Sequence, residues 1–487
     1  MLFNSYEFIF VFLPISFFVY FYLNAKRLTE AGKGWLVFSS LFFYSWWNIA
    51  NLPLILSSML FNYVAGKTIS RQSDDKKGIS RKSILIAGIL LNLALLAYYK
   101  YSDFFIANLN SVMDTQFQPL HLALPLAISF FTFQQIAYLV DSYRRQTHEY
   151  DFLNYSVFVC FFPQLIAGPI VHHKEMMPQF ANIRTKLINY KNIRSGIFIF
   201  CIGLFKKTVI ADTFAVWANN GFDTATSLNL IEAWVTSFSY TFQLYFDFSG
   251  YTDMAIGLAL LFNIKIPQNF NSPYKARDIQ DFWKRWHMTL SRFLRDYVYI
   301  PLGGNRHGNY RTYANLMITF LLGGLWHGAG WTFVFWGFLH GTALIMHRIW
   351  QALGFRMWGW LAWLVTLCFI NITWVFFRAK EWADADKVLS AMFDIHHIVL
   401  PNKLSDYFQF LTPFGLQFGE WGVDISGSQW TTIWIIAGIV TTLYLKNSTE
   451  KLFELKSNYR SSIFAGLCFC GGILSINKVS EFLYFNF

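Results

Sequence analysis

The chain has 487 residues, of which 55% are hydrophobic, 20% aromatic and 14% charged. Soluble proteins carry about 25% charged residues, so this composition excludes an ordinary soluble domain and favours a membrane protein. The net charge of +11 does not indicate nucleic-acid binding, because lysine and arginine also gather in the cytoplasmic loops of membrane proteins. The five cysteines lie in or beside apolar segments without the paired spacing of a zinc site, so no metal is expected.

Apolar segments recur along the whole chain and predict an all-α polytopic membrane protein with roughly 11–13 membrane segments. The first segment lacks a basic start and a cleavage site, so we expect it to be retained as a span. In chain order the apolar pieces, which include one candidate re-entrant loop (Tyr155–Val171) and one broken pair (Ser237–Phe248 and Tyr251–Ile264), are Phe8–Leu23, Trp35–Trp47, Leu52–Ala65, Ile84–Tyr99, Leu120–Val140, Tyr155–Val171, Ser195–Trp217, Ser237–Phe248, Tyr251–Ile264, Tyr313–Leu325, Trp331–Ile349, Trp358–Phe377, Ile433–Leu445 and Ile463–Ile476.

The connecting loops alternate in charge, which predicts their side of the membrane. The loop Lys67–Lys82 has six basic and two acidic residues, and Lys265–Arg311 has nine basic and three acidic residues. Both are therefore expected in the cytoplasm, with the N-terminus outside. Lys100–Gln118 is poor in basic residues and is expected as an outer loop, and Ala379–Trp430 is expected to cap the outer face.

Two of the apolar segments contain features that interrupt a helix. The sequence FFPQLIAGPI within Tyr155–Val171 predicts either a re-entrant loop or a kinked span, because proline and glycine free backbone groups that protein must cover. The sequence DFSGYTD predicts a break between Ser237–Phe248 and Tyr251–Ile264, which places Asp247 and Asp253 in an apolar context.

A charged and aromatic helix is expected over Asp281–Tyr297. Its charged and apolar residues fall on opposite arcs of an ideal helix, which indicates a helix lying in the cytoplasmic interface of the membrane. His287 falls just past the edge of the apolar face and is expected to point toward protein. The alternative is a histidine that only reaches from the interface toward water. The following sequence YIPLGGNR breaks the helix and would let the next span return near His287.

His327 lies in the apolar sequence LLGGLWHGAGW, where a histidine is costly to keep and indicates a functional site. The flanking glycines would let a substrate or another backbone approach closely. Burial favours a neutral imidazole that can act as a general base. The alternative is a histidine that packs between helices and bonds a backbone carbonyl. His340 and His347 lie seven residues apart on one span and are interpreted as structural, because no carboxylate or cysteine joins them.

The motifs FFPQLIAGPI, DFSGYTDMAIG, DFWKRWHMTLSRFLRDYVYIPLGGNR, LLGGLWHGAGWTFVFWG and WVFFRA occur in this order, and together with the start NSYEFIFVFLPI they resemble the membrane-bound O-acyltransferase family. The resemblance is to its bacterial alginate O-acetylase-like branch and, more distantly, to the D-alanyl-lipoteichoic acid transfer protein. It implies one domain over 1–487, with core motifs in 1–378 and a C-terminal loop region and last spans in 379–487. Re-entrant or interfacial helices would surround a central tunnel.

By this resemblance, His327 corresponds to the family's catalytic histidine and His287 to its second active-site histidine. Other residues of the same motifs are expected to bind substrate or support the site: Trp326, Arg295, Asp296, Asn305, Gly324 and Gly328. No cofactor would be bound permanently, and acetyl-CoA or a related acyl thioester would be the donor substrate. His327 would remove a proton from an acceptor hydroxyl, and His287 would position the donor or stabilise the oxyanion. An acyl-histidine intermediate stays open.

The implied enzyme is an acyltransferase of the bacterial inner membrane that moves acetyl groups toward hydroxyls of an extracytoplasmic polysaccharide. Membrane lipid, an extracytoplasmic acetyltransferase and the polysaccharide acceptor are the expected partners, without nucleic acid. An alginate-like exopolysaccharide is the first expectation, and peptidoglycan or another cell-wall polymer is the alternative. A transporter or a non-enzymatic scaffold of polymer export is the second alternative, although the repeated halves typical of transporters are not found.

Overall fold

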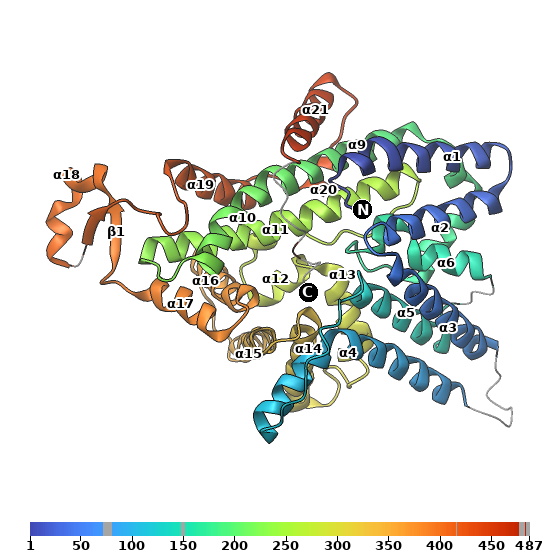
Figure 1. Ribbon diagram of the computed structural model, residues 1–487, viewed down its shortest axis with the longest axis horizontal. Coiled ribbons are helices and arrows are strands. Elements are labelled where there is room, and N and C mark those ends of the chain that lie inside the picture. The colour runs from blue at the N-terminus through green and yellow to red at the C-terminus, as the bar shows by residue number, and fades with distance from the viewer. Residues whose placement is uncertain (72–79, 148–150, 415, 477–482, 484–487) are drawn as a thin grey trace. The chain divides into compact units, whose positions relative to one another are not determined.

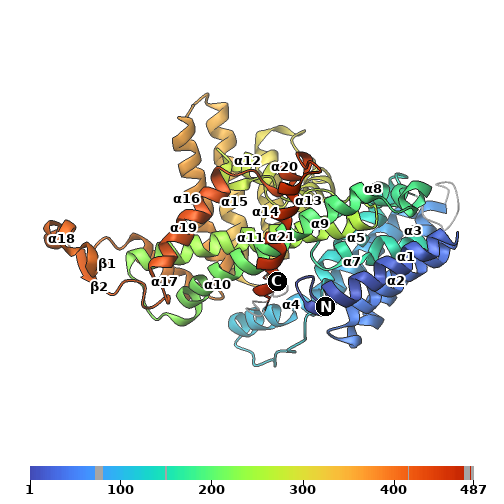
Figure 2. The same cartoon turned by 90° about the horizontal axis from the view of Figure 1, so that it is seen from above.

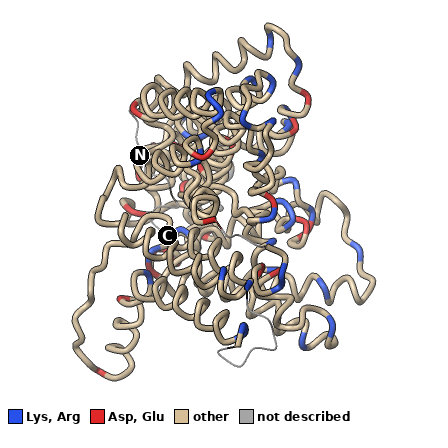
Figure 3. Tube along the Cα trace, turned by 90° about the vertical axis from the view of Figure 1, so that its right-hand side faces the viewer, with Lys and Arg blue, Asp and Glu red and all other residues tan. Residues whose placement is uncertain are grey.

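Helices form nearly all the regular structure of the protein (Figure 1). The computed structural model describes residues 1–71, 80–147, 151–414, 416–476 and 483. Within these residues the strands are confined to one short parallel pair, β1 Ile398–Pro401 and β2 Leu416–Gly419. Most of the trace is free of charge, and acidic and basic residues lie mainly near helix ends and in loops (Figure 3). The predicted all-α polytopic membrane fold is confirmed.

The chain forms two compact units that alternate along the sequence. The first comprises Met1–Leu204, Tyr251–Asn269 and Leu452–Phe469, and the second comprises Phe205–Gly250, Phe270–Lys451 and Cys470–Phe487. Two helices, α9 Tyr190–Phe205 and α11 Leu230–Leu261, contribute residues to both units, as do α20 Ser448–Phe453 and α21 Tyr459–Leu474. The expectation of a single domain stays a prediction.

The other helices of the first unit pack mainly through aromatic side chains. Phe8, Phe12, Phe43 and Phe162 form one cluster, with ring centroids 5.3–6.1 Å apart. The elements of this unit are η1 Phe8–Phe12, α1 Leu13–Ala25, α2 Thr29–Ser45, η2 Ile49–Asn51, α3 Leu52–Arg71, α4 Arg81–Met113, α5 Ile128–Tyr143, α6 Phe152–Cys160, α7 Phe162–Leu165, α8 His173–Ala181 and η3 Ile183–Lys186.

The second unit contains both of the histidines singled out above. Its helices α15 and α16 run side by side (Figure 2). The elements of this unit are η4 Lys206–Ala211, α10 Asp212–Asn219, η5 Asn220–Thr224, η6 Pro273–Lys275, α12 Ile279–Arg285, α13 Met288–Leu294, η7 Arg295–Tyr299, α14 Gly308–His327, α15 Trp331–Ala352, α16 Gly359–Arg378, α17 Trp382–Phe393, η8 Asn402–Leu404, α18 Ser405–Phe408, η9 Gln409–Phe414 and α19 Gln429–Leu443.

Four helices in the described part of the chain are long and apolar enough to cross a membrane. They are Phe8–Ala25, Ile49–Arg71, Arg81–Met113 and Gly359–Arg378. Each matches an expected span, but the total of roughly 11–13 segments stays a prediction. Part of the basic loop expected over Lys67–Lys82 falls on residues 72–79, outside the described residues.

The outer loop was expected to begin at Lys100, but α4 continues to Met113. The predicted start of this loop is therefore wrong. No proline or glycine interrupts this stretch, and Asp114 ends the helix in a left-handed conformation. The Asp103 carboxylate then accepts hydrogen bonds from the backbone N–H groups of Leu120 and His121, at 2.6 and 3.0 Å. The helix therefore supplies the partner that holds the returning chain.

The break expected at DFSGYTD is wrong, because α11 is continuous from Leu230 to Leu261. One glycine inside a helix costs only about 1 kcal/mol relative to alanine. Side-chain hydrogen bonds also hold the N-terminal half of the helix. In the second unit, Asn371 accepts a hydrogen bond from the Ser237 hydroxyl at 2.7 Å and donates one to the Thr241 hydroxyl at 2.9 Å.

The interruption expected within Tyr155–Val171 is present. Helix α6 has nine residues and α7 has four, so α6 is about 14 Å long, which is less than half of a hydrocarbon core of about 30 Å. Protein side chains cover the freed backbone groups: the Phe158 carbonyl accepts from Gln134 and Gln164, and the Ser40 hydroxyl accepts from the Phe162 N–H. This geometry favours the re-entrant interpretation over a kinked full span.

Candidate active site

His287 interrupts the helix in which it was expected. Helix α12 ends at Arg285 and α13 begins at Met288, so the single interfacial helix over Asp281–Tyr297 is wrong. The His287 backbone has φ 41° and ψ 53°, a left-handed conformation that is uncommon for residues other than glycine. Such conformations cost on the order of 1–3 kcal/mol and persist where the surroundings enforce them.

The break turns two consecutive side chains into the protein interior. Trp286 is 1% exposed and His287 is fully buried. On an unbroken helix these neighbours would point about 100° apart. The Trp286 ring packs on Phe282, Phe270 and Trp374, with centroids 5.0–5.7 Å away. Packing of this aromatic cluster thus replaces the helical hydrogen bonds lost at the break.

His327 is the last residue of α14 and is 3% exposed. Its position depends on close packing of α14 against α15. A Cβ atom added to Gly324 would lie 2.3 Å from the Phe333 carbonyl oxygen, and one added to Gly337 would lie 2.4 Å from the Phe320 carbonyl oxygen. Gly324 thus allows close approach of another backbone, and its expected role in substrate binding or support of the site stays a prediction. Gly328, which follows His327, likewise leaves room for the Phe333 ring.

The two histidines lie next to each other in the second unit. Their ring centroids are 6.5 Å apart, with an interplanar angle of 59°. Phe248 on α11 packs edge-on against the His287 ring at 4.8 Å, and Trp326 lies 6.3 Å from His287 and 5.0 Å from His327. The turn after α13 thus brings together residues that are forty positions apart in the sequence.

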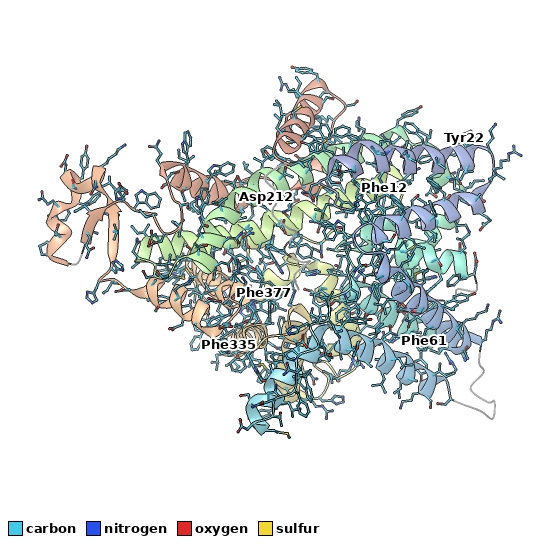
Figure 4. The ribbon with its side chains drawn as sticks, viewed as in Figure 1. Phe12, Tyr22, Phe61, Asp212, Phe335 and Phe377 are labelled. Carbon is cyan, nitrogen blue, oxygen red and sulfur yellow. The ribbon has the colours of Figure 1, made fainter. Side chains whose placement is uncertain are left out.

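Aromatic side chains enclose the other sides of the His327 imidazole. The Trp336 ring on α15 is 5.3 Å away, and the Phe377 ring on α16 (labelled in Figure 4) is 5.0 Å away. Phe333 also packs on Phe377, at 5.2 Å. These rings exclude water and lower the local dielectric, which strengthens any hydrogen bond formed inside the site.

Burial determines the protonation state of His287, which lies outside the expected spans. Desolvation lowers the pKa of His287 from 6.5 to about 3. The ring is therefore neutral near pH 7 and carries one N–H donor and one nitrogen acceptor. A neutral imidazole of this kind can donate its one N–H to a developing oxyanion.

The predicted supporting residues separate into two groups. Trp326 is buried beside both histidines. Arg295 and Asp296 instead pair with each other on η7, with 2.7 Å between Nε and Oδ1, and their side chains are 60% and 28% exposed. Asn305 is also exposed. A substrate-binding role for these three residues stays a prediction.

His340 is held in a hydrogen-bond network between helices. Trp283 Nε1 donates to His340 Nδ1 at 3.2 Å, so the ring proton lies on Nε2, which is 3.2 Å from Thr373 Oγ1. The Thr373 hydroxyl in turn donates to the Ile370 carbonyl. This network connects α12, α15 and α16 and fits the expected structural role. No cluster of three or more His, Cys, Asp or Glu residues suited to a metal ion is found among the described residues.

A buried ion cluster was not anticipated from the sequence. Lys207 Nζ lies 2.8 Å from both Asp212 Oδ1 and Asp247 Oδ1, and all three side chains are at most 3% exposed. Asp247 Oδ2 also accepts a hydrogen bond from the Leu483 N–H at 3.0 Å. Asp212 is labelled on α10 in Figure 4. The signal in the sequence was a lysine inside the apolar segment Ser195–Trp217, combined with Asp247 in another apolar segment.

Comparisons with known proteins agree with the resemblance seen in the motifs. The model of the membrane-bound O-acyltransferase family matches residues 41–381. A peptidoglycan O-acetyltransferase of Helicobacter pylori is 47% identical over 100% of this chain and 98% of the relative. A probable alginate O-acetylase of Pseudomonas aeruginosa is 41% identical over 81% of this chain and 75% of the relative. A teichoic acid D-alanyltransferase of Bacillus subtilis is 27% identical over 46% of this chain and 59% of the relative.

Proposed function

This chain belongs to the membrane-bound O-acyltransferase family and is an acyltransferase, and we propose that it acetylates peptidoglycan outside a bacterial inner membrane that it crosses several times. The observation that carries this choice of acceptor is the extent of the similarity. The match to the peptidoglycan O-acetyltransferase of H. pylori covers the whole chain, including the region after Ala379. An alginate-like exopolysaccharide is the second candidate, supported by the 41% identity to the alginate O-acetylase of P. aeruginosa.

We propose His327 as the general base. Its neutral imidazole takes the proton of an acceptor hydroxyl while the hydroxyl oxygen attacks the thioester carbonyl. The tetrahedral intermediate then expels the thiolate, which takes the proton back from His327 as the C–S bond breaks. The position of His327 at the C-terminus of α14 supports this role, because the negative end of the helix dipole stabilises the transient imidazolium.

His287 is proposed to hold the carbonyl of the donor. The 6.5 Å between the two ring centroids supports a shared role of the two histidines around one acyl group. The neutral His287 ring then donates its N–H to the oxyanion. The fixed backbone of His287 supports this role, because a donor that is already oriented needs no reorganisation during the reaction.

The donor is proposed to be acetyl-CoA or a related thioester that arrives from the cytoplasm as a substrate. The basic stretch Lys265–Arg311, which leads into both histidine motifs, would attract such an anion. The accepting hydroxyl belongs either to the polymer or to an extracytoplasmic acetyltransferase that passes the acetyl group on. Direct attack and an acyl-histidine intermediate lead to the same products.

The acceptor is tested in cells whose chromosomal copy encodes His327→Ala. We expect ester-linked acetate on isolated peptidoglycan to fall to the level of a deletion strain, because the base is missing. The His396→Ala variant, which changes an exposed histidine, serves as the control, and both proteins should accumulate equally in membranes. If His327→Ala left the acetate on peptidoglycan unchanged but removed the acetate from a secreted polysaccharide, the acceptor would be the secreted polysaccharide and not peptidoglycan.

A further inference from the structure

An apolar groove lies in the first unit, away from both histidines in the sequence. It has a volume of about 640 Å³ and is bordered by η1, α1, α9, the end of α11 and α21. Its walls are formed mainly by aliphatic and aromatic side chains, among them Ile9, Leu13, Ile197, Leu261 and Phe469. Contacts between Phe10 and Phe469 at 6.4 Å and between Phe198 and Phe464 at 6.1 Å join these elements around it.

The groove lining contains polar and basic residues near the start of α9 and near the start of α21. These are Arg194, Lys456, Asn458 and Ser461, and the lining contains no aspartate or glutamate. Arg194 is half-buried, and its Nε is buried without a hydrogen-bond partner among the described residues. Asn458 caps α21 by accepting a hydrogen bond from the Ser461 N–H at 2.9 Å. A half-buried guanidinium in a lining that also contains a lysine and no carboxylate is suited to an anion such as a phosphate.

One wall of the groove is about as long as one leaflet of a membrane. The lining on α9 runs from Tyr190 to Cys201, which is about 16 Å along a helix and about half of a hydrocarbon core of about 30 Å. The basic residues belong to segments rich in lysine and arginine, which favours the cytoplasmic side. The α9 wall would then extend from the cytoplasmic headgroup region toward the membrane centre.

We propose that this groove binds an anionic phospholipid of the cytoplasmic leaflet. The phosphate lies between Arg194 and Lys456, and one acyl chain follows the wall formed by Ile197, Cys201 and Leu261. A zwitterionic lipid such as phosphatidylcholine carries a choline cation beside its phosphate, so it would leave the positive charges of Arg194 and Lys456 without net compensation. The phosphates of a CoA donor would leave the apolar walls uncovered. Charge complementarity and the length of the walls therefore favour a charged lipid over both alternatives.

The test uses the full-length protein in phosphatidylcholine vesicles, with and without phosphatidylglycerol. Native mass spectrometry after extraction counts each phospholipid retained per protein. Removing one basic side chain near the membrane surface costs about fivefold in affinity for an anionic lipid. We expect Arg194→Gln to lower retained phosphatidylglycerol by about this factor, relative to Lys26→Gln, which changes an exposed lysine outside the groove. Phosphatidylcholine retention should not change.

A second variant tests the apolar walls without disturbing the fold. Gly466 lines the groove, and a Cβ added there meets nothing within 4 Å, so Gly466→Leu fills the groove from an open position. Gly34 is also open but does not line the groove, so Gly34→Leu is its matched control. We expect Gly466→Leu to displace the lipid and Gly34→Leu to retain it. Undiminished phosphatidylglycerol retention in both Arg194→Gln and Gly466→Leu would overturn the proposal.

Two further outcomes would also contradict a charged-lipid site. These are equal losses of phosphatidylglycerol and phosphatidylcholine in Arg194→Gln, or displacement of the lipid by CoA added to the wild-type protein. The readout does not depend on acetyl transfer, so His327→Ala should retain the same lipid as the wild type. Failure of this proposal and failure of the proposed enzymatic role are therefore distinguishable.

Discussion

The ion cluster of Lys207, Asp212 and Asp247 contains one positive and two negative side chains, all buried. The lysine pairs with both carboxylates. Burying a charge without a partner costs several kcal/mol, so the three residues should not be equivalent. The lysine stabilises two buried charges, whereas each aspartate can be neutralised and still leave a matched pair.

Replacing Lys207 by methionine should therefore lower the free energy of unfolding by about 3–5 kcal/mol, because both buried carboxylates lose the ammonium group that lies 2.8 Å from each. Asp247→Asn should cost clearly less, since Lys207 keeps Asp212 at 2.8 Å. Thermal unfolding of the purified proteins in detergent measures both effects. Equal losses in the two variants would show that the cluster does not act through charge balance.

His287 should make stability depend on pH in a defined direction. Its pKa is about 3 in the folded protein against 6.5 for an unperturbed histidine, so the unfolded chain binds more protons between these values. The free energy of unfolding therefore falls as the pH is lowered from about 6.5 toward about 3. We expect His287→Gln to weaken this fall between pH 7 and pH 5, and His396→Gln, at an exposed site, to leave it unchanged. If the free energy of unfolding of His287→Gln depended on pH as that of the wild type does, the burial of the His287 ring would not be the cause of the pH dependence.

At the scale of elements, the sequence was informative where helices are regular. Apolar length located α1, α3 and α16, and proline and glycine marked the interruption after α6. The sequence misled where tertiary packing outweighs local preference. Gly250 did not break α11, and the amphipathic pattern over Asp281–Tyr297 concealed the left-handed turn at His287. Helical periodicity carries no information about a break that aromatic packing stabilises.

The close contact between α14 and α15 fixes the position of His327. Adding a methyl group at Gly324 places it against a backbone oxygen at 2.3 Å, so the two helices must move apart. Overpacking of this kind costs about 1–3 kcal/mol. We expect Gly324→Ala to lower both thermal stability and acetyl transfer, whereas Gly34→Ala, at an open helical position, should change neither. Wild-type activity in Gly324→Ala would show that this contact does not position the histidine.

For the whole molecule, the same motifs that predicted the family also predicted which two histidines meet. Spacing and breakers suggested that His327 returns toward His287, and the ring centroids are 6.5 Å apart. The enclosing rings of Phe248, Trp336 and Phe377 were not anticipated, because they come from three separate helices that only the fold brings together. A long-range contact of this kind leaves no periodic signal in a single sequence.

The most direct test of the central claim is acetyl transfer by the purified protein reconstituted in vesicles with labelled acetyl-CoA and a peptidoglycan fragment. Where a partner acetyltransferase is required, it is added at a fixed amount. The account predicts that His327→Ala lowers the transfer rate by about 100-fold or more, as expected for loss of a general base, while the protein stays folded and His396→Ala keeps the wild-type rate. A His327→Ala protein that transfers acetyl groups at the wild-type rate would contradict the account.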